Sequence, residues 1–591
     1  MAKGMATVSS SQIVGTTHAV ASDENNRLMK LSYVFSVLAI LVVAVILRAW
    51  RIGTVPGPLA DEVVAAASLH YHFSSRSGGI LSIVTPILDG RVLVKTFGGT
   101  RVANLRVIPV MFGLGTVALT IDLARRLFGR PASLLAGCAV AVMPWAIYYS
   151  RIFFPASEYI FFSLFTIYAG VAIVHERSKW WLPICATSAG VTMYIYPVSI
   201  VTTPLLLLVV AASFRKATSR LAARSWLLGS LTLLALLLPY VWAHVVNIAT
   251  GTATINSVIG SRQLFRSRLS FATDLLHFFR SYLSYFTPSY LLLHGDPNPA
   301  QSVQIIGEVG PIIAALGLVG IMISLRNIRD PRYVLVALLL LVFPVGDALT
   351  LQNSIGNSDV AALGVIPWGV LAGIGGAGIA RSIAEFRARL ATRVTAATAA
   401  APGAAAAERP STARVMGTYL VALLLLAQVS LFAPTYFGRY DNTYAFYFES
   451  GFTPVAGILS RAGIYGLPVT IDAGYGRSVM FSYFLDYQLN ITSVYQSCDL
   501  LPLRTLLYSV AQQVIIIREG WDYGSTPGCV NQLTLIQREI RAFVQAGGNV
   551  HLEMLGSFYN NPNQLAGPRY KTAVLLLQHG RLLPASDRPA G

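Results

Sequence analysis

The chain has 591 residues, of which 54% are hydrophobic and only 12% are charged, whereas a soluble domain is usually about 25% charged. Its mean hydropathy of +0.59 is too high for a soluble protein with one anchoring helix. A net charge of +18 would suggest nucleic-acid binding in a soluble chain. Here the basic residues lie between apolar blocks, which indicates a membrane protein and argues against nucleic acid as a partner.

The N-terminal stretch 1–27 is polar and lacks the apolar core of a signal peptide. We expect it to be a disordered cytoplasmic leader. Eleven apolar blocks follow in a predicted transmembrane domain, residues 28–434, and each is interpreted as a membrane helix, which needs about 20 residues to cross a bilayer. The blocks lie at 31–49, 104–125, 132–149, 154–174, 180–194, 197–213, 226–246, 309–325, 333–350, 360–380 and 413–434.

Basic residues follow the even-numbered blocks and are nearly absent after the short odd-numbered ones. Arg125 and Arg126 follow the second block, for example, whereas 351–358 after the ninth block carries no charged residue. This alternation is the positive-inside pattern, which predicts a cytoplasmic N-terminus in a multi-pass protein of the cytoplasmic (inner) membrane. Three segments then lie outside, namely 50–103, 247–308 and 435–591.

The last of these segments, 435–591, is predicted to be an extracytoplasmic α/β domain. An amphipathic helix is expected over Gln537–Gln545, and short β-rich runs at Val469–Asp472, Gln513–Arg518, Val550–Met554 and Lys571–Gln578. Cys498 and Cys529 share this exported segment, so they either form a disulfide or remain two free thiols. No cysteine or histidine spacing indicates a metal site.

The first outer segment begins with two adjacent carboxylates, Asp61 and Glu62, a few residues beyond the end of a membrane helix. One interpretation is structural, with Asp61 capping the apolar helix that follows and Glu62 in its first turn. The functional interpretation is that a carboxylate at the membrane surface acts as a general base towards a hydroxyl group.

Four cations lie on the same predicted side of the membrane, and they are Arg91, Lys95, Arg106 and Arg151. Outer-face arginines run against the positive-inside tendency. A cluster of them suits a lipid phosphate, although Arg106 and Arg151 could equally extend to the lipid head groups. Asp122 is expected to pair with Arg125 or Arg126 one turn later.

Several segments, taken in order, resemble a known family. They are Pro56–Glu62, Asp89–Arg91, Leu105–Gly129, Met143–Arg151, the Tyr194-Ile-Tyr196 run, and Phe286–Asn298. The chain resembles the GT-C membrane glycosyltransferases, and more narrowly the bacterial glycosyltransferase family 39, which includes protein mannosyltransferases and aminoarabinose-transferase-like enzymes. The resemblance implies an all-α GT-C-like membrane fold.

The resemblance also implies a reaction. A sugar would move, with inversion, from a polyprenyl-phosphate donor to an acceptor hydroxyl or amine at the outer face of the membrane. Asp61 would be the base and Glu62 its helper, with no nucleotide or metal cofactor. Arg91, Lys95, Arg106 and Arg151 would neutralise the leaving phosphate. The residues that would line the substrate cavity are Tyr194, Tyr196, Tyr290, His294, Asp296 and Asn298.

The chain departs from the family pattern at three polar positions, where Val92-Leu93, Ser199-Ile200 and Ala300-Gln301 stand. These departures leave open an altered sugar specificity or a non-catalytic relative that acts as a scaffold. A transporter or flippase of lipid-linked saccharide is the alternative from another class. The expected partners are a polyprenyl-phosphate-linked sugar, membrane lipids and an acceptor that is a lipid, a polysaccharide or a protein.

Overall fold

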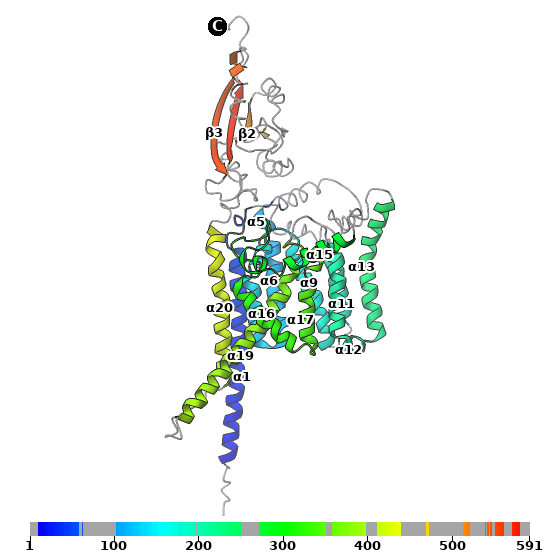
Figure 1. Cartoon of the computed structure of the whole chain (residues 1–591), viewed down its shortest axis with the longest axis vertical. Helices are drawn as coiled ribbons and strands as arrows, with labels where there is room; N and C mark the ends of the chain where they lie inside the picture. The colour runs from blue at the N-terminus through cyan, green and yellow to red at the C-terminus, as the bar shows by residue number, and fades with distance from the viewer. Residues whose placement is uncertain are drawn as a thin grey trace, which may run out of the picture.

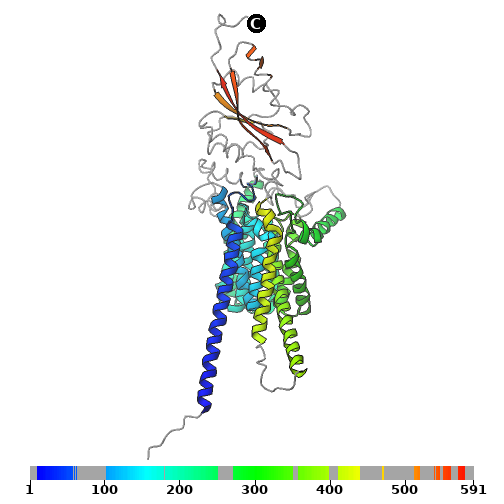
Figure 2. The same ribbon diagram turned by 90° about the vertical axis from the view of Figure 1, so that its left-hand side faces the viewer.

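The structure is a computed structural model of the chain. It describes residues 10–57, 59, 62, 102–176, 178, 180–196, 198–249, 271–349, 357–397, 410–438, 469–471, 512–519, 538, 541–542, 544–545, 550–560 and 570–579. The described part consists of a helical body and a separate small β-sheet (Figures 1 and 2).

The helical body extends from Ser10 to Gly438. Its helices before the second predicted outer segment are α1 (Ser10–Ala49), α5 (Val102–Leu105), α6 (Val107–Phe128), α7 (Arg130–Val142), α8 (Pro144–Tyr149), α9 (Ala156–Glu176), α10 (Trp181–Ile195), α11 (Ser199–Ser213), α12 (Arg215–Thr218) and α13 (Ala223–Ala249). The later ones are α15 (Phe271–Ser284), the π-helical turn η1 (Ser289–Leu293), α16 (Pro311–Arg326), α17 (Pro331–Val342), α18 (Val345–Ala348), the 3-10 turn η2 (Ala362–Gly364), α19 (Val365–Ala397) and α20 (Pro410–Gly438).

Six described helical stretches are long and apolar enough to cross a membrane. They are Lys30–Ala49, Ala103–Phe128, Ala156–Glu176, Pro331–Ala348, Ala362–Leu390 and Val415–Gly438. Shorter apolar helices lie at the other five predicted blocks: Arg130–Val142, Trp181–Ile195, Ser199–Ser213, Ala223–Pro239 and Pro311–Arg326. The chain is therefore a multi-pass membrane protein, and eleven crossings stay a prediction.

Two predicted blocks are broken by proline. The block at 132–149 divides into α7 and α8 because Met143, with an extended backbone, precedes Pro144, and the residue before a proline avoids the helical region. The block at 333–350 divides into α17 and α18 around Pro344, although Phe343 before this proline keeps helical backbone angles. At the N-terminus, α1 begins at Ser10, so the described part of the expected disordered leader is helical. No proline lies between Ser10 and Ala49 to stop that helix.

Close helix packing holds the centre of the body together. Helix α19 contacts α16, α7 and α20, and most of its membrane stretch is buried. A β-carbon at Gly375 of α19 would lie 1.9 Å from the Leu316 carbonyl oxygen of α16, so only glycine allows these two backbones to approach. Helices α1 and α20 lie side by side at the edge of the body (Figures 1 and 2).

The four described strands form one sheet in the order β1-β2-β4-β3. They are β1 (Val469–Ile471), β2 (Gln512–Glu519), β3 (Val550–Asn560) and β4 (Tyr570–His579). Strand β1 pairs with β2 in parallel, and the other two pairs are antiparallel. All four lie at the predicted β-rich runs. The α/β domain and its boundaries stay predictions, and Cys498 and Cys529 lie outside the described residues.

Candidate functional site

A buried ion pair anchors the first outer segment to the helical body. Arg106 stands immediately before α6, and its Nη2 lies 2.5 Å from Oε2 of Glu62 with both side chains fully buried. Its Nε donates to Oε1 of Glu62 at 2.8 Å. This two-point contact is the strong form of an arginine–carboxylate pair, and it fixes the orientation of both groups.

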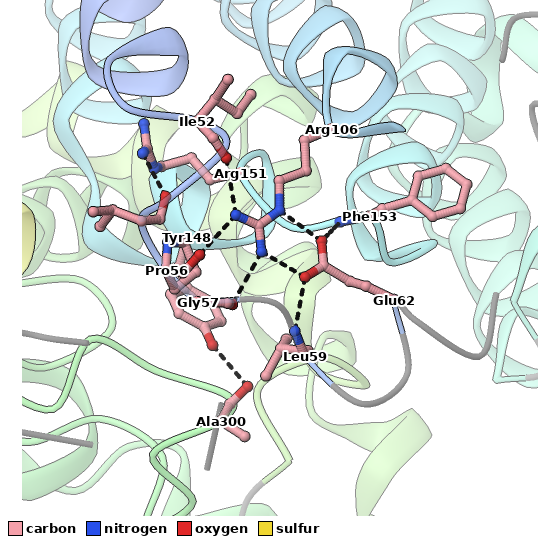
Figure 3. Close-up of polar contacts among 11 residues, drawn as sticks. Ile52, Pro56, Gly57, Leu59, Glu62, Arg106, Tyr148, Arg151, Phe153 and Ala300 are labelled. Atoms are coloured by element: carbon pink, nitrogen blue, oxygen red, sulfur yellow. Dashed lines mark hydrogen bonds and ion pairs between the residues drawn. The ribbon is translucent and has the colours of Figure 1, made fainter. Parts of the chain in front are cut away.

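The same guanidinium also holds the loop that leads to Glu62. Arg106 donates to the carbonyl oxygens of Ile52 at 2.9 Å, Pro56 at 2.7 Å and Gly57 at 3.0 Å. The loop therefore closes around the arginine (Figure 3). We call Arg106, Glu62 and these three loop residues the first-loop anchor.

Both oxygens of the Glu62 carboxylate accept hydrogen bonds from the protein. Its oxygens accept from the backbone N–H of Leu59 at 3.0 Å and of Phe153 at 2.5 Å, in addition to Arg106. Glu62 is thus fixed in place directly after position 61, and its role as a helper of Asp61 stays a prediction.

Arg151 binds the carboxyl end of α1. Its guanidinium donates to the carbonyl oxygens of Leu47, Arg48, Trp50 and Val55 at 2.6–2.9 Å. It also lies over the ring of Phe437, 4.9 Å from the ring centre. Arg151 therefore joins α1, the loop at Val55 and the end of α20.

Two of the four predicted phosphate ligands are thus placed. Arg106 and Arg151 are both 0% exposed and bind the chain itself, so in this arrangement they shape the loop. Contact between either guanidinium and a phosphate stays a prediction. Asp61, Arg91 and Lys95 lie outside the described residues.

A second group of polar residues gathers under the second outer segment. Asp296 Oδ2 accepts from the backbone N–H of Ser358 at 2.7 Å, and the Ser358 hydroxyl donates to Oε1 of Glu308 at 2.6 Å. Tyr290 and Ser358 share a hydroxyl hydrogen bond of 2.8 Å. Asp296 and Glu308 are no more than 2% exposed. We call Asp296, Glu308, Asp359, Ser358 and Tyr290 the acidic loop cluster.

Burial controls protonation in the acidic loop cluster. Burial, with a smaller contribution from the neighbouring Asp359 carboxyl, raises the pKa of Asp296 to about 7. Burial also raises the pKa of Glu308 to about 8, with Asp296 adding to the effect. Because burial disfavours a charged carboxylate that has no cation beside it, these two groups hold protons near neutral pH.

The two tyrosines of the Tyr194-Ile-Tyr196 run bind different parts of the protein. Tyr196 is buried and donates to Asp359 Oδ2 at 2.6 Å, which joins it to the acidic loop cluster. Tyr194 instead donates to the Leu236 carbonyl oxygen of α13 at 2.6 Å. The structure therefore brings Tyr196, Tyr290 and Asp296 together, and it places Tyr194 towards α13.

The remaining two predicted cavity residues lie in the turn beside Asp296. The side chain of Asn298 accepts from the Ala300 backbone N–H at 3.0 Å. The backbone N–H of Asn298 donates to Asp296 Oδ1 at 2.8 Å. His294 is exposed, and its Nδ1 lies 3.3 Å from the Ser289 hydroxyl. Asn298 thus shapes the turn that presents Asp296.

Helix α8 lies beside both the first-loop anchor and the acidic loop cluster. Trp145 donates through Nε1 to the Ser358 carbonyl oxygen at 3.0 Å. The backbone N–H of Trp145 donates to the Glu308 carbonyl oxygen at 3.0 Å. The Tyr148 hydroxyl donates to the Ala300 carbonyl oxygen at 2.7 Å, beside the first-loop anchor (Figure 3). Helix α8 therefore binds the second outer segment at a place close to the first-loop anchor.

Three buried carboxylates were not predicted as site residues, namely Glu158, Glu308 and Asp359. Glu158 lies in the first turn of α9, five residues after Phe153, and is 7% exposed. No hydrogen-bond partner for its buried Oε2 is found in the described part of the chain. An acidic residue inside the apolar block 154–174 was the signal that could have found it, since such residues are usually functional.

Other polar groups have structural explanations. Asp122 pairs with Arg125 and Arg126 at 2.5 and 2.9 Å, as predicted. Asp347 is buried and accepts from Tyr285 at 2.6 Å and from the Asn357 side chain at 3.0 Å. Among the described residues, no group of three or more His, Cys, Asp or Glu side chains could hold a metal ion.

Two apolar grooves in the described helices lie apart from these groups. One, of about 460 Å³, lies between α1, α7 and α20. The other, of about 370 Å³, lies between α9, α10, α11 and α13. Neither is lined by a residue of the first-loop anchor or of the acidic loop cluster.

The fold is similar to solved membrane glycosyltransferases. The crystal structure of ArnT from Cupriavidus metallidurans bound to undecaprenyl phosphate matches with a TM-score of 0.51 and 13% identity, over 92% of this chain and 98% of that chain. The apo form of the same protein matches with a TM-score of 0.50 and 13% identity, over 93% of this chain and 98% of that chain. The Archaeoglobus fulgidus oligosaccharyltransferase in the apo form matches with a TM-score of 0.45 and 12% identity, over 88% of this chain and 69% of that chain. The chain therefore has the fold of the GT-C membrane glycosyltransferases.

A family model narrows this class. Residues 91–242 match the family described as dolichyl-phosphate-mannose-protein mannosyltransferase. No curated protein sequence matches the chain. The resemblance to GT-C glycosyltransferases and to protein mannosyltransferases that the sequence motifs indicate is thus confirmed.

Proposed function

We propose that the protein is an inverting glycosyltransferase that moves a sugar from a polyprenyl-phosphate donor to an acceptor hydroxyl or amine at the outer face of the cytoplasmic membrane. In the reaction with a hydroxyl, Asp61 takes the proton of the acceptor. The acceptor oxygen bonds to the anomeric carbon, the bond from that carbon to the phosphate oxygen breaks, and polyprenyl phosphate leaves with the electron pair.

The first-loop anchor is the observation that carries this proposal. Asp61 is bonded to Glu62, so their α-carbons lie about 3.8 Å apart, and Glu62 is held by Arg106 and by two backbone N–H groups. A general base must be held within hydrogen-bond reach of the proton that it takes. A buried ion pair beside position 61 supplies that rigidity at the end of the membrane helices.

The donor class rests on the membrane setting and on the fold. A solved protein with this fold has undecaprenyl phosphate bound. A donor with a polyprenyl tail stays in the bilayer, so its phosphate must be met at the membrane surface. Arg91 and Lys95 are the proposed phosphate ligands of the first outer segment, since Arg106 and Arg151 already bind backbone carbonyls.

Glu158 is a further candidate for substrate contact. Its buried Oε2 without a described partner is an acceptor that a sugar hydroxyl or ammonium group would satisfy, because a buried unpaired carboxylate oxygen is costly. Ser157 beside it donates to the Pro109 carbonyl oxygen of α6 at 2.9 Å. Glu158 therefore lies on the same helix pair that holds the first-loop anchor.

The deciding experiment compares the wild type with Asp61→Asn in membrane vesicles supplied with a panel of radiolabelled polyprenyl-phosphate sugars. Loss of the general base should lower transfer by about 10²–10⁴-fold. Binding of undecaprenyl phosphate should remain, because the proposed phosphate ligands are unchanged. Asp330→Asn is the matched control, since Asp330 pairs with Arg332 at the other end of the chain's membrane helices and its loss should leave transfer unchanged.

Two other outcomes of this experiment would contradict the proposed reaction. Unchanged transfer by Asp61→Asn would exclude Asp61 as the base. Undecaprenyl phosphate binding without transfer of any sugar by the wild type would favour a scaffold that keeps only the lipid site.

A further inference from the structure

Helix α15 exposes an apolar stripe that the proposed reaction does not use. Leu275, Phe279 and Leu283 follow one another at intervals of four residues, and Leu276 lies beside them on the helix. These four side chains are 43%, 51%, 59% and 69% exposed in that order. A row of exposed large apolar side chains on one helix indicates a partner surface.

A second face of α15, next to the stripe, is bound to the protein. Ser281 donates to Asp347 Oδ2 at 3.2 Å, and Tyr282 donates to the Leu341 carbonyl oxygen of α17 at 2.8 Å. The helix is thus attached by one face to the ends of α17 and α18. Its orientation about its own axis is therefore set, and the apolar stripe points outward.

The stripe continues a surface that already faces lipid. Leu341, whose carbonyl oxygen accepts from Tyr282, is itself 54% exposed on the membrane helix α17. Figure 1 shows α15 at the same end of the helical body as α5, next to α17. The apolar stripe therefore begins where the lipid-facing side of α17 ends.

Polar residues border the stripe on its far side. Arg280 and His277 are exposed and lie one after the other around the helix from Leu276. An apolar stripe with a cation at its border is the pattern of a helix that lies flat in the interface of a bilayer. The cation suits the phosphate layer and the stripe suits the acyl chains beneath it.

We propose that α15 is an interfacial helix that lies in the outer leaflet, with Leu275, Leu276, Phe279 and Leu283 among the acyl chains and Arg280 at the lipid phosphates. Because Ser281 and Tyr285 join this helix to Asp347, lipid contact holds the second outer segment at the membrane surface. The partner is the phospholipid bilayer itself, and a second copy of the chain is the competing occupant.

The test measures which solvent surrounds each face of α15 in the full-length protein. Single cysteines replace Leu276 and its neighbour His277 in turn, in a background whose four native cysteines are replaced by alanine. Each is spin-labelled in vesicles of phosphatidylcholine and phosphatidylglycerol. The ratio of oxygen to nickel-complex accessibility should be at least about threefold higher at position 276 than at 277, because oxygen concentrates in lipid and the nickel complex in water.

Two results would overturn the proposal. Equal ratios at the two positions would mean that the stripe faces water. Low accessibility to both reagents at position 276, with spin–spin broadening between labels, would mean that a second copy covers it. Phe279→Cys repeats the measurement one turn away, so that a folding defect of one variant does not decide the result.

Discussion

The first-loop anchor and the acidic loop cluster bury charge in opposite ways. In the first, the Glu62 carboxylate meets the Arg106 guanidinium at 2.5 Å. In the second, Asp296 lies near the Asp359 carboxyl, Glu308 lies near the Asp296 carboxyl, and burial raises the pKa of Asp296 and of Glu308. Helix α8 contacts the acidic loop cluster through Trp145, and Tyr148 of the same helix donates to the Ala300 carbonyl oxygen beside the first-loop anchor.

The difference separates two ways of holding a loop. In the first-loop anchor, attraction between the opposite charges of Glu62 and Arg106 holds the loop. Carboxyl groups without a cation hold their loop only while they keep their protons. The first outer segment is thus held firmly, whereas the second outer segment is held conditionally.

The largest effect is expected from Glu62→Gln, which leaves the Arg106 charge buried without its partner. Removing one member of a buried pair costs about 3–5 kcal/mol. The matched control is Asp330→Asn, because Asp330 and Arg332 also lie 2.5 Å apart but are partly exposed, where a pair contributes at most about 1 kcal/mol. Denaturant unfolding in detergent measures both, and equal losses would contradict the comparison.

The next effect is a pH dependence of the second outer segment. Asp296 and Glu308 bind protons more tightly in the folded chain than in the unfolded one, so the stabilisation is present at low pH and is lost as pH rises towards about 8. We expect a loss of about 2–4 kcal/mol in local stability over that range. Hydrogen exchange of residues 289–309, corrected for intrinsic rates, measures it.

Glu308→Gln tests the cause of that pH dependence. The amide keeps an oxygen that can accept from Ser358 and from the Asp296 backbone N–H, as Oε1 of Glu308 does, but it cannot ionise. The slope with pH should therefore become shallower. A slope identical to that of the wild type would mean that Glu308 does not control the opening of the segment.

The smallest effect is expected from Gly307→Ala, which acts on packing and leaves charge unchanged. A β-carbon at Gly307 would lie 2.3 Å from the backbone of Leu291 and Leu292. Such overpacking usually costs about 1–3 kcal/mol. Gly438→Ala is the control, because nothing lies within 4 Å of a β-carbon there, and a thermal melt that falls equally for both variants would contradict the prediction.

Much of the fold follows from local pattern alone. Apolar blocks long enough to span a bilayer mark the helices, and proline marks breaks such as the one before Pro144. The four β-rich runs mark the strands. Each of these signals depends on residues that are close together in the chain, which is why no tertiary information is needed.

The pairing of charges does not follow from local pattern. Glu62 and Arg106 are 44 residues apart, and the sequence predicts one as a helper of the base and the other as a phosphate ligand. Tyr194 and Tyr196 are two residues apart, yet one points to α13 and the other to Asp359.

By itself, then, the sequence determined a multi-pass membrane protein, the positions of its helices and strands, and its likeness to GT-C glycosyltransferases. Only the tertiary structure decided that Arg106 holds a loop and that Asp296 joins Glu308. Burial in a low-dielectric interior decides whether an ionisable group needs a partner, and burial depends on contacts between segments far apart in the chain.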